Sequence, residues 1–303
     1  MINFIRLVPQ RISRRIRLLF APFKLAKLYK DGLPKEFTEG LTYLLKGKAS
    51  NKVLDVSARI EEIRREIAAG GSKPVKVLYS PKPGSSGNVV MENLKPQHGK
   101  ILDFSMEQIS KTGKNERWGV YLHLLASSFQ VKTILELGSC VGISGCYLSS
   151  VPSCETFITV EGSEDLAAIA EKNIKQLKPD AQILNMLFDD ALDEILPSLK
   201  SKIDFAFIDG HHEKIATIHY FERLIPYLSD GAVVVFDDVS WSHDMRDAWN
   251  ILSQRGEFSH SVDLGHVGIS LINLPIADNI PKYWDLQTVL GKKKIGNPHG
   301  WQK

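Results

Sequence analysis

Over residues 116–275 the chain alternates short apolar runs with helical patterns, and this alternation restricts the possible fold more than any other feature. Five runs rich in β-branched residues predict strands: Thr133–Leu137, Thr156–Val160, Gln182–Met186, Ile203–Ile208 and Ala232–Phe236. A helical pattern follows each run: Ile143–Ser150, Glu164–Leu177, Leu192–Leu199, Ile215–Leu228 and Asp244–Arg255. Strands that alternate with helices predict an open α/β sheet of parallel strands, because each helix carries the chain back to the start of the next strand.

Two later apolar runs, Phe258–Asp263 and Val267–Ile272, are separated only by Leu264–Gly265–His266. So short a connection leaves no room for a crossover helix, and the pair therefore predicts an antiparallel hairpin that closes the sheet. We expect one α/β domain over residues 116–275.

Three zones flank this domain. Residues 1–70 predict a helical N-terminal extension, with one helix between Pro9 and Pro22 and a second over 51–69. Residues 71–115 are rich in turn formers, including Ser80–Gly87, and are interpreted as a linker or cap segment. Residues 276–303 are interpreted as a C-terminal tail.

Composition excludes several classes of protein. The formal net charge of +3 is too small to indicate a nucleic-acid partner. The start of the chain lacks the features of a signal peptide, and no apolar run is long enough to span a membrane, so we expect a cytoplasmic location. Three cysteines, Cys140, Cys146 and Cys154, are expected to be reduced and packed in the core.

Basic residues crowd the first thirty positions. The amphipathic helix there can pack on the domain or on a partner subunit, which leaves a homo-oligomer open. Alternatively, residues 1–30 contact an anionic membrane surface, and the protein is then peripheral at the inner membrane.

The turn after the first strand predicts a nucleoside-type cofactor. Gly138 and Gly142 let backbone N–H groups approach a ligand, because no Cβ blocks the way. Glu136 adds a carboxylate, which suits hydroxyl or ammonium groups better than a pyrophosphate. This combination favours a cationic cofactor, S-adenosylmethionine, over NAD.

Every later strand of the parallel set also ends in acids. In open α/β sheets the ligand lies beyond the carboxyl ends of the strands, so these acids are expected to face it. Glu161 can accept hydrogen bonds from both hydroxyls of a ribose, and Asp190 follows the third strand at a place that suits an adenine edge. Each acid alone could instead be a helix cap.

Asp209, Asp237 and Asp238 converge if the fourth and fifth strands are neighbours. Three carboxylates in one crevice call for a cation, and oxygen ligands suit Mg²⁺ best. His211 and His212 adjoin this group. Either histidine can take a proton from a hydroxyl, ligate the metal or simply begin a helix.

These segments resemble those of a known family. Glu136–Ser144 looks like the first motif of class I S-adenosylmethionine-dependent methyltransferases, closest to the catechol and caffeoyl-CoA O-methyltransferase type. Phe207–His212 and Val235–Val239 resemble the metal-binding strand ends of that type and of its bacterial relatives. The resemblance covers residues 116–275 and implies a Rossmann-like, seven-stranded, mostly parallel sheet whose last strand is antiparallel.

The resemblance also implies roles for single residues. Asp209, Asp237 and Asp238 would be metal ligands, and His212 stands where the catechol-type enzymes carry a catalytic Lys. Asp238 stands where those enzymes usually carry Asn, a departure shared with bacterial sugar and secondary-metabolite methyltransferases. The full set of expected cofactor-binding residues is Glu136, Gly138, Ser139, Gly142, Glu161, Asp190 and Asp209.

The sequence thus predicts an O-methyltransferase that uses S-adenosylmethionine and a divalent cation on a hydroxylated small molecule, such as a sugar, a polyketide or a phenol. The catalytic base would be His212 or His211. An NAD-dependent oxidoreductase is disfavoured, because Cys140 replaces the second glycine of its fingerprint. The sequence also leaves open a non-catalytic scaffold tethered to a membrane and a hydroxylase-like relative built on the same fold.

Overall fold

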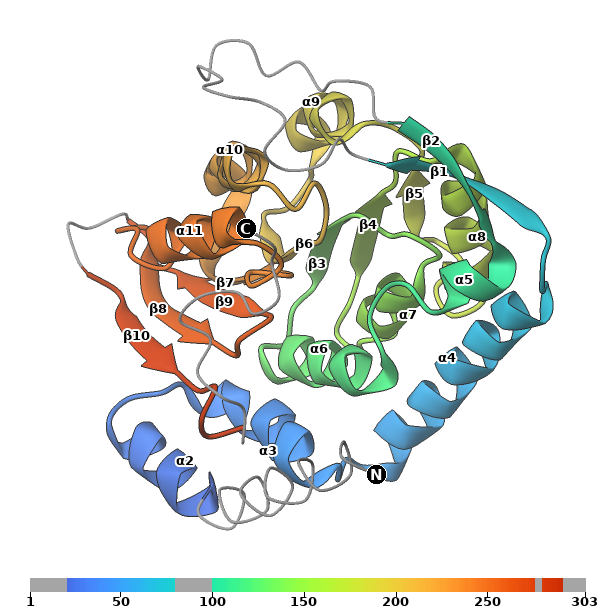
Figure 1. Ribbon diagram of the computed structural model, residues 1–303. Coiled ribbons are helices and arrows are strands. Elements are labelled where there is room, and N and C mark those ends of the chain that lie inside the picture. The colour runs from blue at the N-terminus through green and yellow to red at the C-terminus, as the bar shows by residue number, and fades with distance from the viewer. Residues whose placement is uncertain (1–20, 80–99, 276–279, 291–303) are drawn as a thin grey trace, which may run out of the picture.

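A single sheet of eight strands lies at the centre of the computed structural model, which describes residues 21–79, 100–275 and 280–290. The strand order is β10-β8-β9-β7-β6-β3-β4-β5 (Figure 1). The strands are β3 (Thr133–Leu137), β4 (Thr156–Val160), β5 (Gln182–Leu184), β6 (Ile203–Ile208), β7 (Leu228–Phe236), β8 (Phe258–Asp263), β9 (Gly268–Ile272) and β10 (Lys282–Asp285). Strands β3 to β7 pair in parallel, whereas β9 runs antiparallel to both β7 and β8.

The register brings the ends of the central strands to one edge. Leu137 pairs with Val160 on one side and with Ile208 on the other, and Ile208 pairs with Phe236. The residues that follow these four positions therefore meet at the same carboxyl edge. Strand β3 is also where the chain order reverses, which is the position of the ligand crevice in open α/β sheets.

All seven expected strands are present, including the antiparallel hairpin of β8 and β9. The eighth strand, β10, corrects the interpretation of residues 276–303 as a tail only, because Lys282–Asp285 pairs in parallel with β8. Its sequence is polar and lacks the apolar alternation that marks a strand. A side-chain contact adds to the backbone pairing, since the Tyr283 hydroxyl donates to Asp263 at 2.9 Å.

Helices cover both faces of the sheet (Figure 1). One apolar core lies against α9 (Phe188–Ser198), α10 (Lys214–Leu224) and α11 (His243–Leu252). The other core lies against α6 (Glu116–Ser128), α7 (Ile143–Ser149) and α8 (Glu164–Ile174). The short 3₁₀ turn η3 (Ile225–Tyr227) leads from α10 into β7.

The second core continues into the N-terminal helices. These are α2 (Ala21–Lys30), η1 (Lys35–Phe37), α3 (Thr38–Lys46) and α4 (Asn51–Ala69). Phe37 packs edge-on against Phe129, with ring centroids 5.7 Å apart, and the Ser57 and Tyr147 hydroxyls lie 3.0 Å apart. The predicted helix between Pro9 and Pro22 lies almost wholly outside the described residues. Within those residues, no helix has the length and apolar character needed to cross a membrane.

A separate hairpin leads from α4 to the sheet domain. It consists of β1 (Pro74–Tyr79) and β2 (Lys100–Ser105), followed by α5 (Met106–Ser110). The β1 backbone donates to the start of α8, from Lys76 to Asp165 at 2.7 Å and from Leu78 to Ser163 at 2.5 Å. The predicted loop at Ser80–Gly87 lies outside the described residues.

Candidate active site at the carboxyl edge of the sheet

The turn between β3 and α7 is held by packing that only glycine permits. Gly138 has φ +100°, and a Cβ there would lie 2.0 Å from the Asp209 carbonyl oxygen. Gly142 has φ +84°, and its Cβ would lie 2.9 Å from Cα of Ala170 in α8. Positive φ and close backbone contact both favour glycine, so the chain's own packing already requires these residues. A ligand can then approach the same N–H groups.

Two polar side chains lie buried at this turn. Glu136 is completely buried, and its Oε2 accepts a hydrogen bond from Thr159 at 2.7 Å. Burial raises the pKa of Glu136 to about 7, although Ser144 and Thr159 donate to the carboxyl group. Ser139 is 1% exposed, and its hydroxyl has no hydrogen-bond partner within the described part of the chain. A buried hydroxyl without a partner at a cofactor-type turn suits a ligand contact.

Glu161 directly follows β4 and stabilises the turn by accepting hydrogen bonds from the backbone. Its Oε2 accepts from the Cys140 amide at 2.8 Å and its Oε1 from the Ser163 amide at 2.9 Å. Burial raises the pKa of this carboxyl, and the backbone donors oppose the shift. An ionised carboxylate has about four acceptor positions, so room remains for ribose hydroxyls.

The first turn of α9 carries two adjacent acids with different surroundings. Asp190 is exposed. Asp189 is half-buried and accepts from His219 at 2.7 Å and from Arg223 at 2.8 Å, which ties α9 to α10. The helix begins four residues before the predicted pattern, so both acids belong to its first turn.

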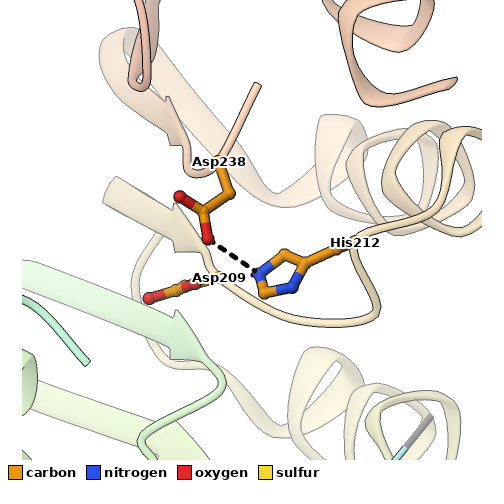
Figure 2. A group of neighbouring side chains, drawn as sticks. All are labelled: Asp209, His212 and Asp238. Atoms are coloured by element: carbon orange, nitrogen blue, oxygen red, sulfur yellow. Dashed lines mark hydrogen bonds and ion pairs between the residues drawn. The ribbon is translucent and has the colours of Figure 1, made fainter. Parts of the chain in front are cut away.

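Asp209, His212 and Asp238 form a cluster beyond β6 and β7 (Figure 2). The His212 Nε2 atom lies 3.3 Å from Asp209 Oδ1 and 3.6 Å from Asp238 Oδ2. Burial lowers the pKa of His212, but the two carboxylates outweigh it and the net pKa is raised. Burial alone would raise the pKa of Asp209, yet Lys114 and His212 together hold it below the usual value. The cluster thus stabilises charge on Asp209 and His212.

Asp237, the third acid of the predicted metal site, does not contact His212 and is paired with Lys114 instead. The Asp237 side chain is fully buried, its Oδ1 accepts from the Asp238 amide at 2.8 Å, and its Oδ2 is ion-paired with Lys114. Asp238 has the left-handed φ of +48°, and its Oδ2 lies beside His212, whereas Asp237 has no such contact with the histidine. The structure therefore groups Asp209 and Asp238 with His212, not with Asp237.

The two neighbouring histidines also separate. His211 has φ +57°, and its Nδ1 lies 2.9 Å from the Tyr220 hydroxyl, away from the acidic cluster. Burial lowers its pKa, Asp189 opposes this and His212 adds to it. Only His212 lies beside the carboxylates.

One tryptophan lies beside the acidic cluster, whereas a second tryptophan and the three cysteines lie away from it or pack in the core. Trp241 is 41% exposed, and its ring lies 5.7 Å from that of His212, so it flanks the cluster. Trp118 packs edge-on against Tyr121 in the core. All three cysteines are free, and burial raises the pKa of each thiol, which fits the predicted packing role.

The segment that carries this edge of the sheet is similar to known proteins. Residues 135–239 match a family model described as a methyltransferase domain. This segment contains the glycine turn, Glu161 and the whole acidic cluster. Residues 135–239 are thus similar to a methyltransferase domain.

Three known proteins are similar to this chain. A catechol O-methyltransferase of Niastella koreensis is 32% identical over 124 residues, covering 40% of this chain and 55% of that protein. The tapetum-specific methyltransferase 1 of Arabidopsis thaliana is 23% identical over 155 residues, covering 48% of this chain and 65% of that protein. An O-methyltransferase from Bacillus cereus, solved with SAH, shares the fold with a TM-score of 0.50 and 18% identity, over 78% of this chain and 97% of the other. The chain thus covers less than two thirds of each of these two curated relatives.

Sequence reasoning missed one residue at this edge of the sheet. Lys114 lies in the zone interpreted as linker or cap, yet its ammonium group reaches Asp237. No local pattern marks it, because the contact joins residues far apart in the chain. Only the fold brings the two together.

Proposed function

We propose that this protein transfers a methyl group from S-adenosylmethionine to a hydroxyl oxygen of a small molecule. The observation that carries the proposal is the meeting, at one edge of the sheet, of the Gly138 turn, Glu161 and the Asp209–His212–Asp238 cluster. The first two suit the nucleoside and amino-acid parts of the cofactor, and the cluster suits the chemistry at the acceptor oxygen.

The cofactor side of the proposal rests on groups with spare hydrogen-bonding capacity. Glu161 keeps free lone pairs for ribose hydroxyls, and the buried Ser139 hydroxyl lacks a partner in the described chain. Because the sulfonium methyl is already electrophilic, the protein mainly has to align carbon with oxygen and exclude water. The tight packing of the turn against Asp209 would fix the cofactor relative to the acidic cluster.

The acidic cluster fits a divalent cation. One ligand atom from each of Asp209, His212 and Asp238 lies within 4.8 Å of the other two. Mg²⁺ is commonly held by one or two carboxylates together with substrate and water, so Asp209 and Asp238 would suffice for it. A metal with more affinity for nitrogen would also recruit His212. When bound, a divalent cation would lower the pKa of the acceptor hydroxyl.

With Mg²⁺, we assign His212 the role of base. Its imidazole lies between two carboxylates, which stabilise the imidazolium that forms when it takes the hydroxyl proton. Trp241 beside it offers an exposed ring surface against which a flat acceptor can lie. His211 has no such position, because its ring is engaged with Tyr220.

The test is methyl transfer from labelled S-adenosylmethionine to a panel of vicinal diols, with Mg²⁺ or with excess chelator. We expect label on an acceptor oxygen, loss of transfer in chelator and loss in Asp209→Asn. Asp55→Asn, an exposed acid on α4, is the matched control and should keep full activity. The proposal is contradicted if the wild-type chain transfers label to no acceptor. Full activity in excess chelator would contradict only the role of the metal.

A further inference from the structure

Lys114 enters the acidic edge from outside the matched domain. Its ammonium is ion-paired with Asp237 and lies 3.9 Å from Asp238 Oδ1, and its side chain is only 14% exposed. The partner Asp237 side chain is completely buried. A buried ion pair of this kind is expensive to break, because the remaining charge would stay uncompensated.

The backbone around Lys114 is fixed from the N-terminal extension. Arg64 of α4 donates to the Lys114 carbonyl at 2.5 Å and to the Ser110 carbonyl at 3.1 Å. Asn115, directly after Lys114, caps α6 by accepting from the Trp118 amide at 3.2 Å. Hydrogen bonds therefore fix the backbone on both sides of Lys114, which fixes the point from which its side chain reaches the acids.

This arrangement changes the donor set at the edge. Asp237 accepts from the Asp238 amide through Oδ1 and is ion-paired with Lys114 through Oδ2, so a cation would have to compete with Lys114 for this carboxylate. The positive charge of Lys114 also acts on the cluster, since its ammonium lies 3.9 Å from Asp238 Oδ1. Like charges repel, so a cation entering beside Asp238 would meet the lysine.

We propose that Lys114 is a resident counter-ion that keeps Asp237 out of the metal ligand set and weakens the binding of divalent cations. The inference rests on the metal-assisted function proposed above. It adds that Lys114, in the segment between α5 and α6, sets the affinity of the site for the metal. Asp209 and Asp238 remain the carboxylates available to the ion.

The first test measures Mn²⁺ binding to the full chain by calorimetry or electron paramagnetic resonance. Lys114→Met keeps the length of the side chain and removes its charge. We expect its Mn²⁺ dissociation constant to fall by about tenfold or more, because Asp237 becomes a free carboxylate beside the ion. Lys111→Met is the control, since that lysine is exposed and pairs with Glu107, and it should leave Mn²⁺ affinity unchanged. Equal or weaker binding by folded Lys114→Met overturns the inference.

A second variant covers the case in which Lys114→Met fails to fold with Asp237 unpaired. The double variant Lys114→Met, Asp237→Asn removes both charges of the pair. We expect it to unfold at the wild-type temperature and to bind Mn²⁺ within about threefold of wild type, because the two charges offset each other. Loss of about tenfold or more would show that Asp237 is a ligand in the native protein and would overturn the inference.

Failure of the inference is separable from failure of the proposed function. S-adenosylmethionine binding and methyl transfer in the wild-type chain decide the function, whatever Mn²⁺ does. If neither wild type nor Lys114→Met binds Mn²⁺, the counter-ion role is wrong even where methyl transfer is present.

Discussion

Glu136→Gln is expected to remove a loss of stability that the wild-type sheet domain undergoes as pH rises. Glu136 is completely buried in the middle of the sheet, and burial raises the pKa of its carboxyl to about 7, from 4.5 for the exposed group. Hydrogen bonds from Ser144 and Thr159 offset only part of this effect. The ionised form is therefore disfavoured in the folded protein.

The sign and size follow from the two pKa values. As pH rises from about 4.5 to about 7, the unfolded chain loses the proton while the folded chain keeps it, so the free energy of unfolding falls. The contribution of Glu136 to the free energy of unfolding is fully present below the pKa of the unfolded chain. It is fully lost above the pKa of the folded chain. At about 1.4 kcal/mol per pKa unit, the gap corresponds to about 3 kcal/mol.

Urea unfolding of wild type and Glu136→Gln, at about pH 5 and about pH 8, tests this reasoning. Other groups titrate equally in both proteins, so the difference between them isolates Glu136. We expect the variant to gain about 2.5 kcal/mol on wild type between the two pH values, because a part of the total is already lost at about pH 5. Glu194→Gln, an exposed acid on α9, should follow wild type at both. Identical pH dependence of wild type and Glu136→Gln would refute the argument.

Two further substitutions probe the support of the site, both by urea unfolding. Gly138→Ala should cost more than about 3 kcal/mol, because its Cβ would lie 2.0 Å from the Asp209 carbonyl oxygen at φ +100°. Gly47→Ala, at φ +66° with nothing within 4 Å, should cost only about 1 kcal/mol, and equal losses would contradict the close-contact argument. Arg246→Met should cost about 3–5 kcal/mol, because Arg246 donates to buried Asp263 at 2.6 Å and its removal leaves that carboxylate unpaired. A loss below about 1 kcal/mol would show that the pair is dispensable.

Much of the fold could be predicted because strands buried on both faces of a parallel sheet have unbroken apolar sequences. The bounds of β3, β4 and β6 agree with the sequence to the residue. Strand β7 begins at Leu228, four residues before the predicted run, where exposed polar positions hide its start. Strand β10 pairs with β8 although its sequence has no apolar alternation, and its Tyr283 contact to Asp263 joins residues far apart in the chain.

The candidate site could be predicted only in outline. Strand-end acids align because the register of parallel strands is regular, so the convergence of Asp209 and Asp238 follows from the sequence. No local pattern shows which of the two adjacent acids lies beside His212, and in the structure it is Asp238. The contact between Lys114 and Asp237 depends on tertiary structure alone.

Calorimetric titration with S-adenosylmethionine decides whether this edge of the sheet binds the cofactor, on which every step of the proposed function depends. We predict saturable, stoichiometric binding to the wild-type chain. We also predict binding weakened by about tenfold or more in Glu161→Gln, because the amide cannot offer the charge-assisted hydrogen bonds of a carboxylate. No binding by wild type at about 1 mM cofactor, a concentration that detects even about 4 kcal/mol of binding free energy, would contradict the proposed function.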